Sequence, residues 1–427
     1  PLASRDPNYI GAITTGSVRR EPIPDDAHAA AGDARVRQLA GEAPQRDDPV
    51  VRPRGPIEHV IYVIKENRSY DQVFGDLPGA DGDPKLVLFG EGITPNLHAL
   101  ARRFGIFDRT FTSAKVSADG HNWSTAAIAN DYVEKMWPAN YSRRRSVYDF
   151  EDPSGASRPH AGYLWDAAVN AHVSFRNYGE YFYVSNPQGG FVSDPGPVLL
   201  DRTDKQFVGY NTQVSDLTRE AEWEREFRGF ERDGNLPALE IVRFPNDHTE
   251  GTRPKSLRPE AFVAQNDAAL GKLVDAVSHS RFWKSTAIFS IEDDSQNGPD
   301  HVDAQRTEFV LASPYARGGV QHATYNTASV LHTIEIILGL APMTTYDARA
   351  LPLYGAFGAK ADLRPFEALA PRYDIERRNA ESAYRARDSE RLDFAHADAA
   401  PDGTLNDILW HAVKGARATP PPYGAFR

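Results

Sequence analysis

The stretch Ile57–Ile64 reads IEHVIYVI and decides the fold. It is rich in β-branched residues and almost continuously apolar, a pattern that is typical of a strand buried on both faces of a parallel sheet. The sequence therefore predicts an α/β fold with a mostly parallel central sheet, in which this stretch is a central strand flanked by helices.

Similar patterns follow along the chain. Thr94 and Pro95 supply the N-cap and first-turn proline of a helix that ends near Phe104. A strand at 105–111 would complete a strand–helix–strand unit. Apolar runs predict further strands at 239–244, 286–291 and 308–312, and helical spacing predicts helices at 262–277 and 330–338.

The remaining segments suggest one large domain with additions. Residues 1–54 are too polar to form a core and are predicted to be an extended arm lying on the main domain, with one helix at 27–41. Residues 55–427 are expected to form a single domain, with an irregular, aromatic-rich insertion at about 137–235. C-terminal docking helices are expected at about 371–415, including a charged helix at 375–392 and a helix containing Leu405–Trp410.

Composition excludes several classes of protein. The chain has 48 Lys and Arg against 59 Asp and Glu, a net charge of −11, which argues against nucleic-acid binding. It has no Cys, so disulfides, thiolate nucleophiles and Cys-based metal sites are excluded. No apolar run approaches the ~18–20 residues of a membrane span. The chain opens with Pro1, and we expect it to be a mature or trimmed form whose export signal is missing.

Polar clusters follow four of the predicted elements. They read ENRSYD at 66–71, SADGHNWS at 117–124, PNDHT at 245–249 and EDDSQNGPDH at 292–301. Ligands of open α/β sheets bind beyond the carboxyl ends of the strands. Carboxylate, amide, hydroxyl and imidazole groups suit Mg²⁺, Mn²⁺ or Ca²⁺, and less exclusively Zn²⁺. We therefore expect a divalent metal ion here.

Each cluster taken alone also has an ordinary structural explanation. Glu66 and Asn67 could form a strand-end turn, Asp247 could cap a helix, and His301 could be a structural histidine. Adjacent carboxylates such as Asp293 and Asp294, however, repel one another unless a cation or donor compensates them. The occurrence of all four clusters at strand ends favours a shared site.

Three motifs resemble a known family. Glu66–Gly75 (ENRSYDQVFG) resembles the first signature of the bacterial phosphoesterase family that contains phospholipases C and a group of acid phosphatases. Asp293–Val302 (DDSQNGPDHV) resembles its second signature, and Asp108–Ser117 resembles the segment leading to its nucleophile. The resemblance runs from about residue 57 to 340. The most similar subgroup is the "alkaline phosphatase family" proteins often fused behind a YncE-like propeller. Residues Tyr9–Asp25 resemble the linker on the propeller side of those proteins.

The resemblance implies an alkaline phosphatase-like fold and a set of site residues. The implied metal ligands are Glu66, Asn67, Asp293 and Asp294, completed by a hydroxyl nucleophile. Asp247, His248 and His301 would lie toward the phosphate and leaving group, and Asp247 is also a candidate ligand. Phospholipases C have Thr-x-Pro-Asn-Arg where this chain has Ser117–His121. Ser117 is therefore the best candidate nucleophile, with Ser124 and Thr125 as alternatives.

The expected activity is hydrolysis of a phosphate ester, either a small molecule or a phospholipid headgroup, through a phosphoseryl intermediate. Binding to the metal would activate the Ser117 hydroxyl. Asn122, with His121 in the same helix start, would face the phosphoryl oxygens, and His301 or His248 would protonate the leaving alkoxide or activate water. The alternatives are a non-catalytic, metal-stabilised binding module and a sulfatase or phosphonate hydrolase of the same superfamily. A periplasmic or secreted location is expected.

Overall fold

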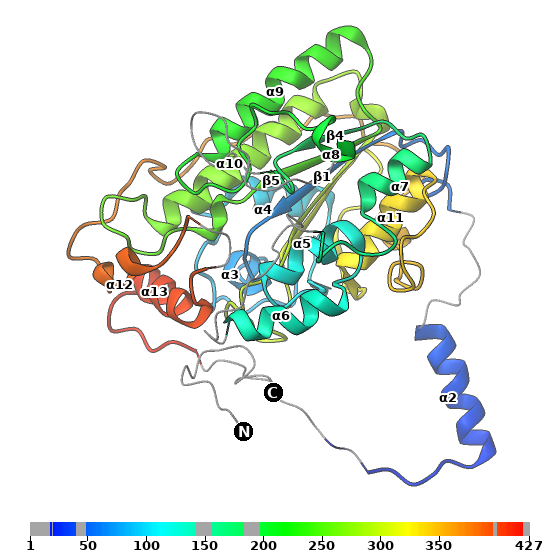
Figure 1. Ribbon diagram of the computed structural model, residues 1–427, viewed down its shortest axis with the longest axis horizontal. Helices are drawn as coiled ribbons and strands as arrows, with labels where there is room; N and C mark the ends of the chain where they lie inside the picture. The colour runs from blue at the N-terminus through cyan, green and yellow to red at the C-terminus, as the bar shows by residue number, and fades with distance from the viewer. Residues whose placement is uncertain are drawn as a thin grey trace.

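The protein, represented by a computed structural model, is described at residues 18, 20–39, 48–141, 155–182, 197–395 and 399–421. Its centre is a five-stranded sheet with the order β4-β5-β1-β6-β7 (Figure 1). The strands are β1 (His59–Lys65), β4 (Phe175–Tyr178), β5 (Leu239–Phe244), β6 (Thr286–Glu292) and β7 (Phe309–Ala312). The first four strands in the order are parallel and β7 is antiparallel. The predicted α/β fold, with 57–64 as a central strand, is confirmed.

The alternation of side chains along β1 explains why both faces of the sheet are covered. Val60, Tyr62 and Ile64 belong to one apolar cluster, and Ile61 and Val63 belong to the other. Helices α5 (Ser117–Ala126), α7 (Leu164–Asn170) and α11 (Thr327–Leu338) contribute to the first cluster. Helices α4 (Pro95–Phe104), α9 (Asp216–Asp233) and α10 (Pro259–Ser278) contribute to the second. This is a three-layer α/β/α arrangement (Figure 1).

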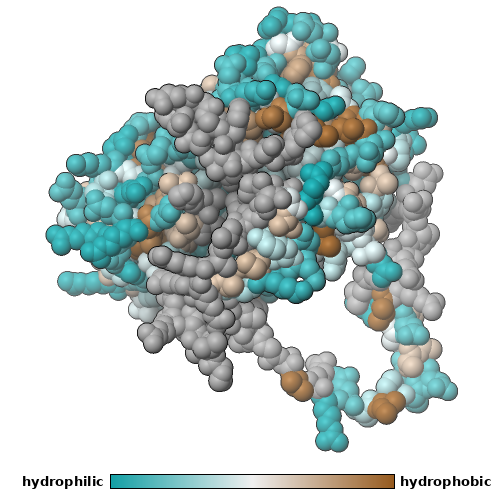
Figure 2. Space-filling view, in the orientation of Figure 1, coloured by the Kyte–Doolittle hydropathy of each residue, from teal (hydrophilic) through white to brown (hydrophobic). Residues whose placement is uncertain are grey.

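Shorter elements complete the description. The helices are α2 (Asp26–Leu39), α3 (Tyr70–Phe74), α6 (Asp131–Tyr141), α8 (Pro197–Leu200), α12 (Ala386–Arg391) and α13 (Asp402–Lys414), with 3₁₀ turns η1 (Asn246–His248), η2 (Trp283–Ser285) and η3 (Tyr354–Ala356). Within the described residues, no helix is both long and apolar enough to span a membrane. The described surface in Figure 2 is mostly hydrophilic, as expected when the apolar side chains fill two internal clusters.

The predicted strand at 105–111 is wrong. Its place is taken by two short strands, β2 (Ile106–Phe107) and β3 (Thr110–Phe111), which pair with β8 (Val320–Gln321) and β9 (Tyr325–Asn326) outside the central sheet. Asp108 interrupts the run, because its buried carboxylate accepts a hydrogen bond from Asp81 N–H and pairs with His322. The parallel neighbours of β1 are instead β5 and β6, which come much later in the chain.

The segment expected to be an irregular insertion, 137–235, also contains regular structure. It supplies the edge strand β4 and the 18-residue helix α9. Ser215 caps α9 by accepting the Leu217 N–H, and Gly234 ends it in the left-handed conformation (φ 73°). Residues 142–154 and 183–196 of this segment lie outside the described residues.

The two ends of the chain differ from expectation in different ways. Helix α2 agrees with the predicted helix. Residues 20–36 are exposed, however, and α2 stands off the main body (Figure 1), so this part of the arm does not lie on it. Residues 1–17 and 40–47 of the arm lie outside the described residues. The helix predicted at 375–392 is wrong except for α12, because residues 377–379 run extended beside 255–258 and hydrogen-bond to them. The predicted docking helix at the C-terminus is present as α13.

Candidate active site

The carboxyl ends of β1 and β6 bring two pairs of ligand-type residues together. Glu66 and Asn67 follow β1 directly, and Asp293 and Asp294 follow β6. Lys65 and Glu292 are direct partners in the sheet. The Glu66–Asn67 pair and the Asp293–Asp294 pair therefore follow the two strands at the same position along the strand direction. The Asp293 N–H donates to Lys65 O (3.0 Å), which extends the strand pairing into the site.

Ser117, the first residue of α5, lies among these oxygen atoms. Its hydroxyl donates to Asp294 Oδ2 (2.7 Å) and accepts a hydrogen bond from Asn67 Nδ2 (2.8 Å). The same amide donates to Asp293 Oδ1 (3.1 Å) and Asp294 Oδ2 (2.6 Å). We call Glu66, Asn67, Ser117, Asp293 and Asp294 the ligand cluster; its members are at most 1% exposed.

The helix start that carries Ser117 is fixed by a side chain of the same segment. Asp119 accepts hydrogen bonds from the N–H groups of Lys115 and Val116, which turns the chain into α5. The helix begins at Ser117, so His121 and Asn122 lie in its second turn and not at its start, where the sequence analysis placed them. Ser117 therefore lies in the first turn, where the helix dipole favours negative charge.

Glu66 is held by two side chains that are distant in the sequence. Its Oε1 accepts a hydrogen bond from Arg243 Nε (2.9 Å) and lies 3.2 Å from His121 Nε2. Burial raises the pKa of Glu66, but the charge of Arg243 and the contact with His121 outweigh it and lower the pKa to about 2. On its other side, His121 Nδ1 lies 2.8 Å from Glu180 Oε1. Glu66 is thus ionised, and His121 is oriented by Glu180.

The pKa values of the two aspartates are shifted in the opposite direction to that of Glu66. Burial raises the pKa of Asp294 to about 6. Burial, followed by the neighbouring charge of Asp294, raises the pKa of Asp293 well above its usual value. Buried carboxylates this close together require a cation to be stable as anions.

Unpartnered oxygen atoms indicate where such a cation would bind. Within the described part of the chain, Glu66 Oε2, Asn67 Oδ1 and Asp293 Oδ2 are buried and have no hydrogen-bond partner. All three acceptors belong to the ligand cluster, so a single cation bound there would satisfy them together. Carboxylate, amide and hydroxyl oxygens are the donors that hard divalent ions prefer. The residues present therefore fit a divalent metal ion.

The other predicted hydroxyl and amide groups of α5 do not join the ligand cluster. Thr125 Oγ1 donates to His121 O within the helix, and Ser124 Oγ has no hydrogen-bond partner within the described residues. Asn122 Nδ2 makes only a 3.5 Å hydrogen bond to Ala118 O, while its Oδ1 is buried without a partner. Of the three candidate nucleophiles, only Ser117 contacts the acidic pair.

Asp247 and His248, in η1, lie beside the ligand cluster rather than in it. Asp247 accepts a hydrogen bond from the Glu66 N–H (3.1 Å) and forms an ion pair with Lys65. His248 Nδ1 donates to Thr249 O, and burial lowers the pKa of His248. The carboxylate of Asp247 therefore faces an ammonium group instead of the four predicted ligands.

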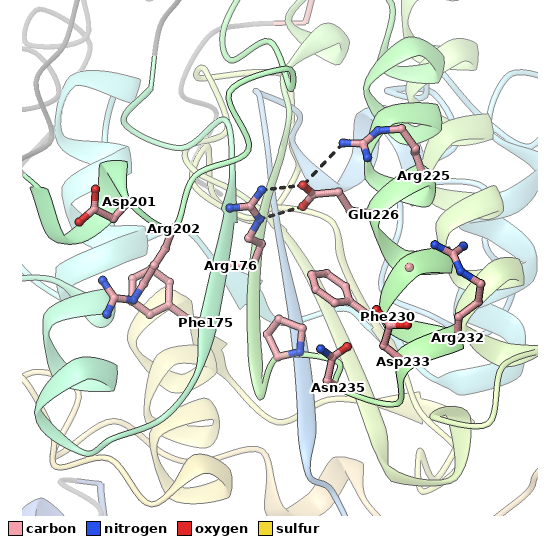
Figure 3. Close-up of a pocket in the computed structure, with 12 residues that line it drawn as sticks. Phe175, Arg176, Asp201, Arg202, Arg225, Glu226, Phe230, Arg232, Asp233 and Asn235 are labelled. Carbon is pink, nitrogen blue, oxygen red and sulfur yellow. Dashed lines mark hydrogen bonds and ion pairs between the residues drawn. The ribbon is translucent and has the colours of Figure 1, made fainter.

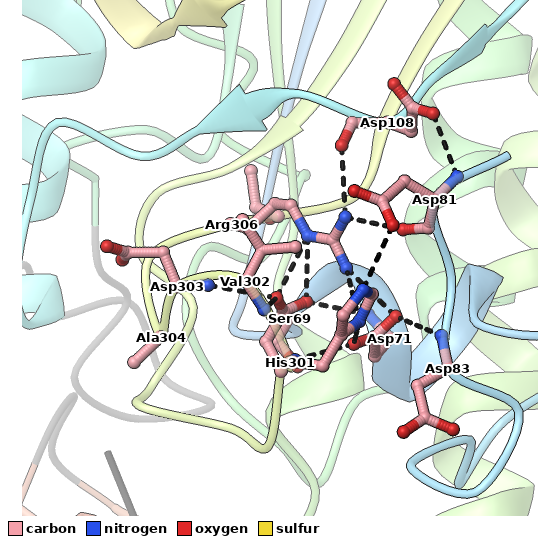
Figure 4. A network of polar contacts seen from close by, with 12 residues as sticks. Ser69, Asp71, Asp81, Asp83, Asp108, His301, Val302, Asp303, Ala304 and Arg306 are labelled. Carbon is pink, nitrogen blue, oxygen red and sulfur yellow. Dashed lines mark hydrogen bonds and ion pairs between the residues drawn. The ribbon is translucent and has the colours of Figure 1, made fainter. Parts of the chain in front are cut away.

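His301 belongs to a separate polar network (Figure 4). Its Nδ1 lies 2.6 Å from Asp71 Oδ2 and its Nε2 lies 3.1 Å from Asp81 Oδ1. Arg306 pairs with Asp71 and Asp300 in the same network, 2.9 Å from each. No recorded contact within the described residues joins His301 to the ligand cluster, so the structure does not bring this predicted catalytic histidine to Ser117.

A cavity of about 510 Å³ lies elsewhere, beside β4 and the C-terminal half of α9 (Figure 3). Arg176 on its wall is neutralised by Glu226, which it contacts through two hydrogen bonds of 2.8 and 2.6 Å. Its rim includes residues just before β5, so it opens at the amino end of the sheet. None of the ligand cluster lines this cavity.

Three buried charged residues near the site were missed by the sequence reasoning: Lys65, Glu180 and Arg243. Two of them carried a signal. Lys65 ends the apolar run of β1, and Arg243 is a lone cation within the strand LEIVRF. A charge in a strand that is buried on both faces needs a partner, and here the partners are acidic residues at the strand ends. Glu180 carried no such signal, because it follows an aromatic stretch.

Comparisons with known proteins identify the family to which the chain belongs. The model of the Phosphoesterase family matches residues 85–341, which is more than half of the chain. A search of curated protein sequences gives no match.

Solved structures with a similar fold are distant in sequence. A protein in the alkaline phosphatase superfamily from Vibrio parahaemolyticus has 15% identity, covers 74% of this chain and 77% of its own, and has a TM-score of 0.48. The lipoteichoic acid synthase LtaP from Listeria monocytogenes has 12% identity, with 74% and 81% covered and a TM-score of 0.44. A phosphonate monoester hydrolase of Agrobacterium radiobacter has 13% identity, with 67% and 74% covered and a TM-score of 0.40. With TM-scores below 0.5, these likenesses carry no weight for the activity of this chain.

Proposed function

We propose that the chain, which belongs to the Phosphoesterase family, is a metal-dependent phosphoric ester hydrolase that uses the Ser117 hydroxyl as its nucleophile. The observation that carries this proposal is the position of Ser117 Oγ between Asp294 and Asn67, beside buried oxygen atoms that have no hydrogen-bond partner among the described residues. Such an arrangement joins a nucleophile, a base and a cation site within one cluster.

The residues that would hold the metal ion are Glu66, Asn67, Asp293 and Asp294, together with Ser117. When bound, the ion would stabilise negative charge on the serine and phosphoryl oxygens. The donors are all oxygen atoms, which favours Mg²⁺, Mn²⁺ or Ca²⁺ over Zn²⁺. Asp247 is left out of this set, because its carboxylate faces Lys65.

Asp294 is suited to remove the proton of Ser117. The serine hydroxyl already donates to Asp294 Oδ2 at 2.7 Å, so the proton has a short path to this carboxylate. Asn67, which donates to the same hydroxyl oxygen, keeps Ser117 in place. The oxygen of Ser117 would then bond to phosphorus while the ester P–O bond breaks, and the leaving alkoxide would take up a proton and depart as an alcohol. Water would hydrolyse the resulting phosphoseryl intermediate, releasing phosphate and restoring the Ser117 hydroxyl.

Positive charge on the other side of the ligand cluster comes from Arg243. Its guanidinium is fully buried, pairs with Glu66 and lies 2.8 Å from His121 Nε2. We propose that His121 and Arg243 face the phosphoryl oxygens and the leaving group, in the place that the sequence had suggested for His248 and His301. A matched pair of variants, His121→Gln and His301→Gln, separates these assignments.

The experiment uses chromogenic phosphate monoesters, phosphate diesters, phosphonates and sulfate esters as substrates. The chain is stripped with a chelator and assayed with each of Mg²⁺, Mn²⁺, Ca²⁺ and Zn²⁺. We expect hydrolysis of phosphate esters that needs a divalent ion and that falls by at least about 10³-fold in Ser117→Ala. Ser124→Ala, in the same helix, is the matched control and should keep its activity.

The outcomes distinguish the alternatives. Equal activity in the wild type and Ser117→Ala would disprove the proposed nucleophile. Preference for sulfate esters or phosphonates would indicate a sulfatase or phosphonate hydrolase. If the wild type hydrolysed none of the substrates with any of the metals, a non-catalytic, metal-stabilised binding module would be favoured.

A further inference from the structure

A second group of buried carboxylates lies beside the ligand cluster. Asp247 in η1, Glu292 at the end of β6 and Glu308 just before β7 place oxygen atoms within 4.8 Å of one another. All three side chains are at most 2% exposed. We call these residues the acidic triad. Three carboxylates converging from three elements resemble the donor set of a metal site.

The triad already surrounds a cation of the chain itself. Lys65 Nζ lies 2.9 Å from Asp247 Oδ2 and 2.9 Å from Glu292 Oε1, and it also contacts Glu308 Oε1. The ammonium group donates hydrogen bonds to Glu292 and Glu308 and forms an ion pair with Asp247, whose Oδ2 has no hydrogen-bond partner within the described residues. The lysine side chain is 1% exposed, so this arrangement is fully internal.

We propose that Lys65 is a built-in cation that takes the place of a metal ion in the acidic triad. A divalent ion at the centre of the triad would lie close to the lysine ammonium, and two cations at such a distance repel strongly in a buried environment. The wild-type chain therefore binds one divalent ion, at the ligand cluster, and none at the acidic triad. Asp247 is a partner of Lys65 and not a metal ligand.

The position of Lys65 also links the two clusters. Lys65 precedes Glu66 in the chain, and Glu292 precedes Asp293. Lys65 O accepts the Asp293 N–H (3.0 Å), and Asp247 Oδ1 accepts the Glu66 N–H (3.1 Å). Removing the ammonium would leave three buried carboxylates without compensation directly beside both pairs of ligands. Lys65 is thus a positioning residue for the ligand cluster.

This inference rests on the proposed function only in that the ligand cluster binds a divalent ion. It makes no use of the hydrolytic step. The number and positions of bound ions are measured without any substrate, so a failure of this inference and a failure of the hydrolase proposal can be told apart.

The test is to count and locate Mn²⁺ ions in the wild type and in Lys65→Ala. We expect one ion per chain in the wild type and two in Lys65→Ala, measured by elemental analysis after gel filtration. Anomalous diffraction should place the additional ion between Asp247, Glu292 and Glu308. Lys284→Ala, which removes an exposed lysine, is the matched control and should bind one ion. Mn²⁺ should also raise the melting temperature of Lys65→Ala more than that of the wild type.

Three results would overturn the proposal. These are a Mn²⁺ ion inside the triad of the wild type, a Lys65→Ala chain that folds and binds only one ion, and an Asp247→Asn chain that has lost an ion relative to the wild type. The Asp247→Asn measurement keeps the proposal testable if Lys65→Ala does not fold, because it is made on a chain that retains Lys65. An unchanged count of one ion in Asp247→Asn supports the proposal.

Discussion

At the scale of single residues, Asp293 and Asp294 are adjacent and buried, and within the described residues neither forms an ion pair with a Lys or Arg side chain. We therefore expect divalent ions to stabilise the fold. An ion present at 100 times its dissociation constant stabilises by about 2.7 kcal/mol. Melting curves with chelator and with Mn²⁺ measure this effect. Asp294→Asn should lose most of it, whereas Asp233→Asn, at the exposed end of α9, should keep it. Equal melting temperatures with and without ions would contradict the metal assignment.

His301 gives a pH-dependent prediction. Burial lowers its pKa, but the contacts with Asp71 and Asp81 outweigh this and raise the pKa above the usual value. The folded chain therefore holds this proton more tightly than the unfolded chain does. The resulting stabilisation is complete below about pH 6.5 and is lost as the pH rises through the raised pKa.

The measurement is urea unfolding at pH 6 and pH 8.5 for the wild type and for His301→Gln. The free energy of unfolding should fall more between these pH values in the wild type than in the variant. Identical pH slopes would show that the Asp71–His301 contact contributes nothing. Activity provides a second readout, because a general acid or base contributes typically about 10²–10⁴-fold. We expect His301→Gln to lose less than about 10-fold.

Residue identities near the strand ends allowed much of the site to be predicted. Glu66, Asn67, Asp293 and Asp294 each follow an apolar run, and this is a local signal that needs no tertiary information. The location of His301 could not be predicted in this way, because its partners Asp71 and Asp81 are more than 200 residues away in the sequence. The sequence motif that contains His301 therefore predicts a catalytic role, whereas its observed contacts are with Asp71 and Asp81.

At the scale of elements, α5 approaches the end of β6 so closely that only glycine fits at position 120. A Cβ atom there would lie 2.7 Å from Asp293 Oδ2 and 3.1 Å from Asp293 O. Gly120→Ala should therefore displace Asp293 and lower both the Mn²⁺ stabilisation and the phosphoesterase activity, the latter by at least about 10-fold. Calorimetry with Mn²⁺ and the ester assay measure the two effects.

A matched substitution on another helix provides the control. Gly229 lies within α9, and a Cβ atom there would meet only Arg232 Nη2, at 3.7 Å. Gly229→Ala should leave metal binding unchanged and stabilise the chain by up to about 1 kcal/mol, because alanine is the better helix former. A Gly120→Ala chain that behaves like Gly229→Ala would show that the close approach to Asp293 is unimportant.

The elements differed in how well they could be predicted. β1, β5 and β6 are buried on both faces, so their apolar runs are unmistakable. The four-residue strand β4 reads FRNY and lacks such a run, so its pairing with β5 could not be seen in a region rich in aromatic residues. Asp108 divides the predicted strand at 105–111 into two short strands. Its carboxylate is stabilised by contacts with Asp81 and His322, and the sequence alone does not show these contacts.

At the scale of the whole molecule, the C-terminal helix α13 supports the loop that follows the acidic pair. Leu405 and Leu409 pack in an apolar cluster with Leu88, Phe89 and Val263, which come from distant parts of the chain. On the same helix, Asn406 Nδ2 donates to Gln296 O (2.7 Å) and to Asn297 O (3.3 Å).

The supported loop has an unusual backbone. Gln296 and Asn297 both have a φ of 50°, a left-handed conformation that side chains other than glycine rarely adopt. Two such residues in succession need external support to stay in place. Asn406 supplies it by binding both of their carbonyl oxygens, two and three residues after Asp294. The helix therefore has separable roles in stability and in shaping the site.

Two variants of α13 test this separation. Leu409→Ala removes part of a fully buried side chain and should cost about 2–5 kcal/mol in the free energy of unfolding, while activity at low temperature stays near that of the wild type. Asn406→Ala should cost less stability, about 1–3 kcal/mol, but it should weaken Mn²⁺ binding and activity because the carbonyls of Gln296 and Asn297 lose their donor. Urea unfolding and metal titration of both variants measure the two quantities. If the two variants lost stability and metal affinity in the same proportion, α13 would act only through packing, and the loop after Asp294 would not depend on Asn406.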